Sequence, residues 1–239
     1  RGEYGMVDTG AANLDELRGR LLFFVLGRSV AEVRLQLPEL RLEALRVDLE
    51  IGALAVEESD GASPLAVRNA VARAERVIAR AKRPVVVEQA ADALRARQKV
   101  VVFVYLREQC EEVARELKRV AKCTVQCVHG DLTPDGRDRQ AEQFRAAERP
   151  ACFVATIDSM GVALSLAGAD LVLFGDLLSE PHKVAQALRR CYRIGTIDRV
   201  LARFVVGRGT IDEDKAHRLM DKLEVITHTT GHGDEQLVA

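Results

Sequence analysis

Short runs of β-branched residues alternate with amphipathic stretches through the second half of the chain. The run KVVVFVY at 99–105 is apolar between its ends, which is typical of a strand buried on both faces of a sheet. Apolar runs of the same kind predict further strands at 124–128, 151–155, 170–174 and 200–206. Helical spacing predicts helices at 85–96, 107–121, 134–146, 181–192 and 212–225. Because strands alternate with helices, we predict an α/β fold, a parallel sheet with helices on both faces.

Before residue 85 the pattern is mainly helical. Leucines recurring at helical spacing predict one or two helices over 14–36, and the alternation LRVDLEI predicts a short strand at 45–51. An Ala/Arg-rich stretch predicts an amphipathic helix at 65–82, which Pro84 is expected to end. We therefore predict three segments: a mainly helical joining or insertion segment at 1–84, an α/β lobe at 85–226, and a loose polar tail at 227–239.

Composition narrows the classes of partner. With 48% hydrophobic and 30% charged residues, the 239-residue chain can bury a sizeable core beneath a charged surface. Its net charge of -1 gives no bulk attraction to nucleic acid or membranes. No apolar run approaches the roughly 20 residues of a membrane span, so no membrane partner is expected. The five cysteines have no paired metal spacing, which predicts no metal site and a reducing cytoplasmic or nuclear location.

One predicted helix ends in two arginines suited to phosphate chemistry. In QALRRCYRIGT, Arg190 and Arg193 are three residues apart, so both project from one side of the helix end, and Gly195 follows. Two guanidinium groups can neutralise the charge that develops during phosphoryl transfer. The alternative is a solvated basic helix end stabilised by the helix dipole. No phosphate loop of the form GxxxxGK[ST] occurs in the sequence, so the chain lacks the usual means of binding a triphosphate unaided.

Two loops after predicted strands carry further candidates. VATIDSMGVALSLAGAD at 154–170 contains small and hydroxyl residues that could admit a phosphodiester backbone, although close packing of the loop on the sheet is an alternative. His129 ends a strand where α/β sheets gather their ligands, although a lone histidine there is more commonly structural. Cys123 and Cys127 are interpreted as buried small residues, because no second pair completes a metal site.

The order of these segments is more specific than any one of them. It runs KVVVFVYLREQCEEVARELK, VHGDLTPDGRDRQAEQF, VATIDSMGVALSLAGADLVLF, QALRRCYRIGT and GTIDE. Taken together, they resemble the second, C-terminal RecA-like lobe of Swi/Snf-type superfamily-two helicases. Within that family they are most similar to the annealing-helicase-like branch and its bacterial and phage relatives. GAANLDEL and VLGRSVAEVRLQLP upstream resemble the segment that joins the two lobes.

The resemblance implies the second lobe of an ATP-dependent translocase that remodels or reanneals DNA. ATP and Mg²⁺ would be bound mainly by a first RecA-like lobe, which this chain does not contain, and the partners would be that lobe and double-stranded or branched DNA. The implied location is the cytoplasm of a bacterial or phage host, or a nucleus. The implied site residues are Arg190 and Arg193 as catalytic arginine fingers, Gln186 and Gly161 at ATP, and Arg107, His129, Thr156 and Ser159 along the DNA backbone.

The departures from the family pattern keep two other hypotheses open. Leu188 and Arg189 stand where the family has Glu-Asp, Tyr192 replaces His, and Thr196 replaces Gln. These departures favour a degenerate lobe that binds DNA or a protein without supporting hydrolysis. A third hypothesis is an unrelated α/β binding domain in which the arginines are structural.

Overall fold

The computed structural model describes residues 13–21, 40–50, 63–159, 164–178, 180–192 and 199–219. The chain divides into two compact units, residues 1–35 with 220–235 and residues 36–219 with 236–239. In the first unit the described element is helix α1 (Leu14–Leu21), in which Arg20 pairs with Glu16 one turn away. The helix predicted from Leu14 is thus confirmed over its first eight residues. Its continuation to 36 and the predicted tail at 227–239 lie outside the described residues.

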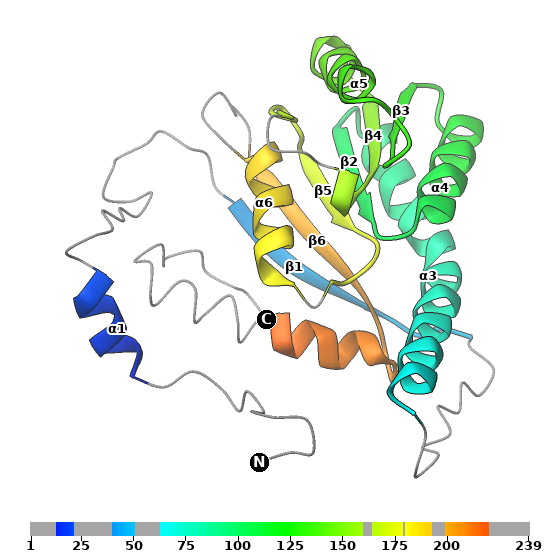
Figure 1. The fold of residues 1–239 in the computed structure, drawn as a ribbon. Coiled ribbons are helices and arrows are strands. Elements are labelled where there is room, and N and C mark those ends of the chain that lie inside the picture. The colour runs from blue at the N-terminus through cyan, green and yellow to red at the C-terminus, as the bar shows by residue number, and fades with distance from the viewer. Residues whose placement is uncertain are drawn as a thin grey trace. The chain divides into compact units, whose positions relative to one another are not determined.

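The second unit is built on a six-stranded sheet in which all neighbouring strands are parallel. The strand order is β1-β6-β5-β2-β4-β3 (Figure 1). The strands are β1 (Leu40–Val47), β2 (Lys99–Val104), β3 (Thr124–Val128), β4 (Ala151–Thr156), β5 (Leu171–Phe174) and β6 (Val200–Gly207). This confirms the predicted α/β fold, a RecA-like parallel sheet.

Helices cover both faces of this sheet. They are α3 (Pro64–Arg95), α4 (Arg107–Val120), α5 (Pro134–Ala146), α6 (Pro181–Cys191) and a helix over residues 211–219. Right-handed crossovers place α3 and α4 on one face, because β1 to β2 and β2 to β3 move in one direction across the sheet. The connections through α5 and α6 move in the other direction, so these helices lie on the opposite face. Figure 1 shows α6 across the sheet from α3.

The core has two layers because successive strand residues point to opposite faces. On one face, Val100, Val102 and Val104 of β2 pack with the buried sides of α3 and α4. On the other face, Phe174 lies between two aromatic rings, with centroids 5.3 Å from Phe103 and 4.7 Å from Phe204. A strand that is buried on both sides has no polar face, which is why β2 reads as a continuous apolar run.

The helix boundary predicted at Pro84 is wrong. α3 continues through Pro84, which lies on its exposed side. Buried residues recur on both sides of the proline, among them Ile78, Val86 and Ala90. An interior proline costs about 3 kcal/mol in a helix, whereas each buried valine or isoleucine contributes about 1.5–3 kcal/mol. The continuous apolar face therefore outweighs the local cost of the proline.

The strand predicted at 45–51 is displaced toward the N-terminus. β1 spans Leu40–Val47 and pairs with β6 from Leu40 opposite Val200 to Val47 opposite Gly207. Alternation of apolar and polar residues runs on beyond Val47, so it does not mark where the partner strand ends. β1 belongs to the segment predicted to join two lobes, yet it supplies an edge strand of the sheet. The division of the chain at residues 84 and 226 stays a prediction.

Most other predicted elements agree with the structure to within one residue or two. α5 begins at the predicted residue because the Thr133 hydroxyl accepts a hydrogen bond from Gly136 N at 3.2 Å and Pro134 occupies the first helical position. The helix predicted at 212–225 is present over 211–219, and its remainder lies outside the described residues. Within the described part of the chain, no helix combines the length and apolar character needed to span a membrane.

Candidate functional site

The carboxyl ends of the strands bring distant segments of the chain to one edge of the sheet. Parallel strands end at a common edge, and there the loops that follow them can form a shared site. Four predicted residues lie in or just after strand ends at this edge, namely Arg107 after β2, His129 after β3, and Thr156 and Ser159 at the end of β4. The fold thus gathers at one edge the residues that the resemblance assigned to DNA.

Arg107 and His129 belong to one charged cluster. Arg107 Nε donates to Glu111 Oε1 at 2.8 Å, and its guanidinium also pairs with Asp131. The His129 Nε2 atom lies 3.6 Å from the same Glu111 oxygen. The hydrogen bond from Arg107 holds the pKa of Glu111 below its usual value. The cluster links the start of α4 to the turn at His129 and Gly130, called here the His-Gly turn. The half-exposed Arg107 remains within reach of an anion from solvent.

Thr156 and Ser159 are buried rather than exposed at this edge. The Ser159 hydroxyl donates to Thr156 O at 2.7 Å and lies 3.3 Å from Val128 O. Arg137 Nη1 donates to Ser159 O at 2.9 Å, and Arg137 Nε donates to Leu132 O at 3.1 Å. These bonds tie the loop after β4 to the turn after β3, so the hydroxyl of Ser159 shapes the backbone of the site.

α6 presents a buried and an exposed side to its surroundings. Val184, Ala187 and Cys191 are buried, whereas Gln186 is exposed. Gln186 and Arg190 are four residues apart and so lie on one side of the helix. Arg190 is half-buried, and its Nε atom has no hydrogen-bond partner among the described residues. Its guanidinium is therefore not committed to a structural bond through that atom.

The start of α6 is tied to the loop after β4. Lys183 Nζ lies 2.9 Å from Asp158 Oδ1 and 2.6 Å from Glu180 Oε2. Two other predicted residues, Arg193 and Gly161, lie outside the described residues. The structure thus places Gln186 and Arg190 on one helix whose start is held near Ser159, and it does not test the roles assigned to any of these residues.

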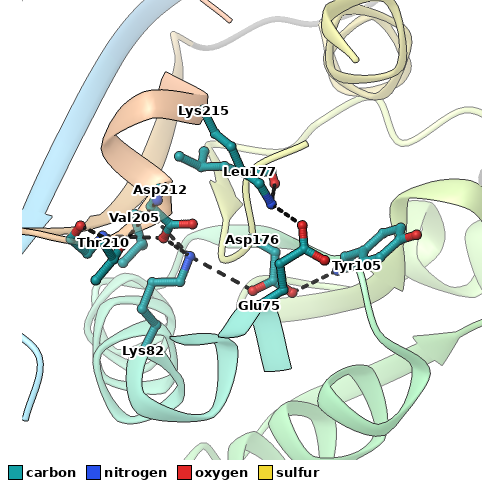
Figure 2. A network of polar contacts seen from close by, with 10 residues as sticks. Glu75, Lys82, Tyr105, Asp176, Leu177, Val205, Thr210, Asp212 and Lys215 are labelled. Carbon is teal, nitrogen blue, oxygen red and sulfur yellow. Dashed lines mark hydrogen bonds and ion pairs between the residues drawn. The ribbon is translucent and has the colours of Figure 1, made fainter. Parts of the chain in front are cut away.

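Sequence reasoning missed a buried ionic network at the same edge (Figure 2). Lys82 of α3 is 1% exposed, and its Nζ lies 2.6 Å from Asp212 Oδ2 and 3.9 Å from Asp176 Oδ1. Its ammonium group also donates to Val205 O at 3.3 Å. Asp176 Oδ2 in turn accepts a hydrogen bond from Tyr105 N at 2.8 Å. Lys82 therefore joins α3 to the ends of β5 and β6, and Asp176 links this network to the end of β2.

A second ion pair extends this network. Lys215 Nζ lies 2.6 Å from Glu75 Oε1 and donates to Leu177 O at 3.3 Å. Burial, which outweighs the attraction of Lys82, raises the pKa of Asp176 above its usual value. The adjoining cavity of about 20 Å³ has room for about one water molecule, too little for a nucleotide. We interpret the network as a support for the loop that leads into α6.

No sequence signal marked Lys82, because it stands in an Ala/Arg-rich helix whose other basic residues, apart from the partly buried Arg83, are exposed. Asp176 and Asp212 both follow strands, and this position after a strand was the one sequence feature that could have marked them as site residues. Across the described part of the chain, no three His, Cys, Asp or Glu side chains gather as ligands for a metal ion. Cys123 and Cys127, interpreted as buried small residues, are both partly exposed.

Comparison with known proteins gives the family of this lobe. Residues 83–195 match the family model of the helicase conserved C-terminal domain. A SWI/SNF-related matrix-associated actin-dependent regulator of chromatin subfamily A-like protein 1 from Bos taurus is 30% identical over 149 residues, which cover 62% of this chain and 16% of the relative. The protein of the same name from Xenopus tropicalis is 28% identical over 237 residues, 93% of this chain and 25% of the relative.

The chain spans a quarter or less of the length of these two relatives. One matching solved structure is the C-terminal part of the Fun30 ATPase domain, with a TM-score of 0.48 and 17% identity over 53% of this chain and 41% of that one. The family match at 83–195 runs from within α3 to just beyond α6 and covers the motifs that begin at Lys99, Val128, Val154 and Gln186, whereas GTIDE at 209–213 lies beyond it. The resemblance inferred from those motifs is confirmed, and residues 83–195 are a helicase conserved C-terminal domain whose curated relatives are SWI/SNF-related proteins.

Proposed function

We propose that this chain is the second lobe of an ATP-dependent DNA translocase of the SWI/SNF-related type. The observation that carries the proposal is the helicase C-terminal domain at 83–195 together with the gathering of its motif residues at one edge of a parallel sheet. The sequence has no phosphate loop, so ATP and Mg²⁺ would be bound mainly by a first RecA-like lobe. Remodelling or reannealing of DNA would be the work of the two lobes together.

In this proposal α6 supplies the catalytic groups of the second lobe. Arg190 and Arg193 would approach the γ-phosphate when the lobes close and stabilise the charge that develops as it is transferred. Gln186 and Gly161 would lie beside the same nucleotide. The Arg190 Nε atom, which lacks a bond within the described residues, leaves a donor for such a role. The ion pairs of Lys183 with Asp158 and Glu180 would hold the start of α6 against the loop after β4.

The DNA contacts would come from the neighbouring strand ends. Arg107 and His129 would approach the phosphates of one strand of double-stranded or branched DNA, with Arg107 exchanging a carboxylate partner for a phosphate. Thr156 and Ser159 would act through the loop backbone that they help to hold, because both are buried. Opening and closing of the lobes would then advance this strand stepwise. Both relatives are named as regulators of chromatin, which supports a nuclear location over a cytoplasmic one.

The test uses the protein in which this lobe is joined to an ATP-binding first lobe. Arg190→Ala and Arg193→Ala should each lower DNA-stimulated kcat by on the order of 10³, as the loss of an arginine finger does. The KM for ATP should change far less, because the interaction forms in the transition state. Arg190→Lys should rescue poorly, since an ammonium cannot present the same planar fork.

Arg189→Ala is the matched control. Arg189 is exposed and adjacent to Arg190, so it lies on a different side of α6. Circular dichroism checks that both variants are folded. Normal turnover in Arg189→Ala together with a large loss of turnover in Arg190→Ala would support the proposal. Normal turnover in Arg190→Ala and Arg193→Ala would contradict it. A wild-type two-lobe protein that binds DNA without hydrolysing ATP would favour the degenerate lobe.

A further inference from the structure

Two cysteines from different elements are in contact beside the His-Gly turn. Cys110 of α4 is fully buried, whereas Cys127 of β3 is partly exposed. Their Sγ atoms are 3.6 Å apart. The Cys110 thiol also lies 3.5 Å from Val128 O, and the Cys127 thiol lies 3.8 Å from Cys110 O. The two sulfurs are thus in contact, and a disulfide requires them to approach from 3.6 Å to about 2.0 Å.

The two thiols differ in how readily they ionise. The hydrogen bond from Cys110 lowers the pKa of Cys127, against the opposing effect of burial, and Lys118 favours its thiolate further. The same hydrogen bond, together with burial, raises the pKa of Cys110 well above its usual value. A partly exposed thiol with a lowered pKa beside a second thiol is the arrangement of oxidation-sensitive cysteine pairs.

The remaining cysteines lack this combination. Cys152 and Cys191 are fully buried, and burial raises the pKa of both thiols. Cys123 is partly exposed, but burial also raises the pKa of its thiol. Of the five cysteines, Cys127 is thus the one best able to react with an oxidant from solvent.

We propose that Cys110 and Cys127 form a reversible intramolecular disulfide when the protein meets a peroxide. The Cys127 thiolate attacks one peroxide oxygen, the O–O bond breaks, and the displaced hydroxide takes a proton to leave as water. The Cys127 sulfenic acid then reacts with the Cys110 sulfur, which loses its proton as the S–S bond forms and a second water leaves. Two thiols are oxidised, one peroxide is reduced to two waters, and a dithiol reductant reverses the reaction.

This modification site is independent of the proposed function, because the thiol contact belongs to the packing of α4 on β3. The bond would join α4 three residues after Arg107 to β3 two residues before His129. The cluster of Arg107, Glu111 and His129 already spans the same two elements. The disulfide would therefore form without separating either element from the sheet.

The reduced 239-residue chain is the material for the test. It is exposed to hydrogen peroxide, its remaining thiols are alkylated, and the peptides are mapped by mass spectrometry without reduction. Two of the five thiols should be lost together, in a single linked pair of peptides containing Cys110 and Cys127. Dithiothreitol should restore both. A linkage from Cys127 to Cys123, or loss of Cys123 with Cys127 still reduced, would overturn the proposal.

Single variants distinguish the attacking thiol, Cys127, from the thiol that then bonds to it, Cys110. In Cys110→Ala the reaction should stop at Cys127, whose sulfenic acid is trapped by dimedone. In Cys127→Ser the Cys110 thiol should stay unmodified, because solvent does not reach it. Cys123→Ser is the matched control, and it should form the disulfide at the wild-type rate. Oxidation of Cys110 at the wild-type rate in Cys127→Ser would contradict the assignment of Cys127 as the attacking thiol.

Discussion

Lys82 Nζ lies 2.6 Å from Asp212 Oδ2 in the interior, with the lysine 1% and the aspartate side chain 5% exposed. The pair joins the middle of α3 to the helix that follows β6, and Asp212 also accepts a hydrogen bond from Gly207 N at 3.3 Å. Each ion loses its hydration on burial and is compensated mainly by the other. Removing one partner alone should therefore leave an uncompensated charge in the core.

Lys82→Met should lower the free energy of unfolding by about 3–5 kcal/mol, the cost of breaking a buried ion pair. Urea denaturation followed by circular dichroism measures this loss. Arg80→Ala is the control, because Arg80 lies two residues away in the same helix and pairs with Glu108 in solvent. It should cost less than about 1 kcal/mol. Adding Asp212→Asn to Lys82→Met should recover part of the loss, because the neutral amide removes the nearer of the two carboxylates that lose Lys82 as a partner. Equal effects of Lys82→Met and Arg80→Ala would show that the buried pair does not determine stability.

The raised pKa of Asp176 predicts a pH dependence of stability. Burial is the main cause of the shift, so the folded protein holds this proton more tightly than the unfolded chain does. The resulting stabilisation is complete below the unfolded pKa of about 3.9 and is lost as the pH rises through the folded value. Asp176→Asn should remove that loss while its amide oxygen still accepts the bond from Tyr105 N. Urea melts of both proteins across this pH range should show the variant gaining stability relative to wild type as the pH rises. A constant difference between them would contradict the prediction.

DNA binding by the chain should be weak, independent of sequence and sensitive to salt, because phosphate contacts carry no base information. Arg107→Ala should weaken binding to all duplexes alike and reduce the slope of log K against log salt by about 1. Fluorescence anisotropy at several salt concentrations measures both quantities. Arg95→Ala is the matched control, since Arg95 is exposed and pairs with Asp92 near the end of α3, at the opposite edge of the sheet. Equal losses in the two variants would show that binding does not use the carboxyl edge.

The 239-residue chain by itself should release no phosphate from ATP above background, with or without DNA. The reason is the missing GxxxxGK[ST] loop, whose backbone N–H groups and lysine bind the phosphates in helicase first lobes. A phosphate-release assay on successive purification fractions measures this. Turnover that follows the chain through every fraction would contradict the proposal that a separate lobe binds the nucleotide.

The local elements of the lobe could be predicted because each has a signal within its own sequence. β2 is a valine-rich apolar run that begins at Lys99, and α5 begins with a threonine cap followed by proline. The placing of Arg107 and His129 at one edge follows from the parallel order of such strands. The family could also be identified from the sequence, because that identification depends on the order of short motifs.

Predictions from local sequence signals were wrong where contacts with a distant segment determine the structure. Pro84 breaks isolated helices, but α3 continues because its apolar face packs on the sheet and on α4. The ends of β1 depend on β6, which lies far along the chain, and not on the alternation within β1 itself.

The sequence by itself therefore determined the alternation of strands and helices, the family and the candidate residues, because these depend on neighbouring positions and motif order. Only the tertiary structure decided which of those side chains are buried. Ser159, expected along DNA, has its hydroxyl bonded to the backbone, and Lys82, one basic residue among several in α3, is the one enclosed by Asp176 and Asp212. Burial and charge pairing are properties of segments that meet in space. A linear pattern therefore does not specify them, and Lys82 was found only when the fold brought the ends of three strands against α3.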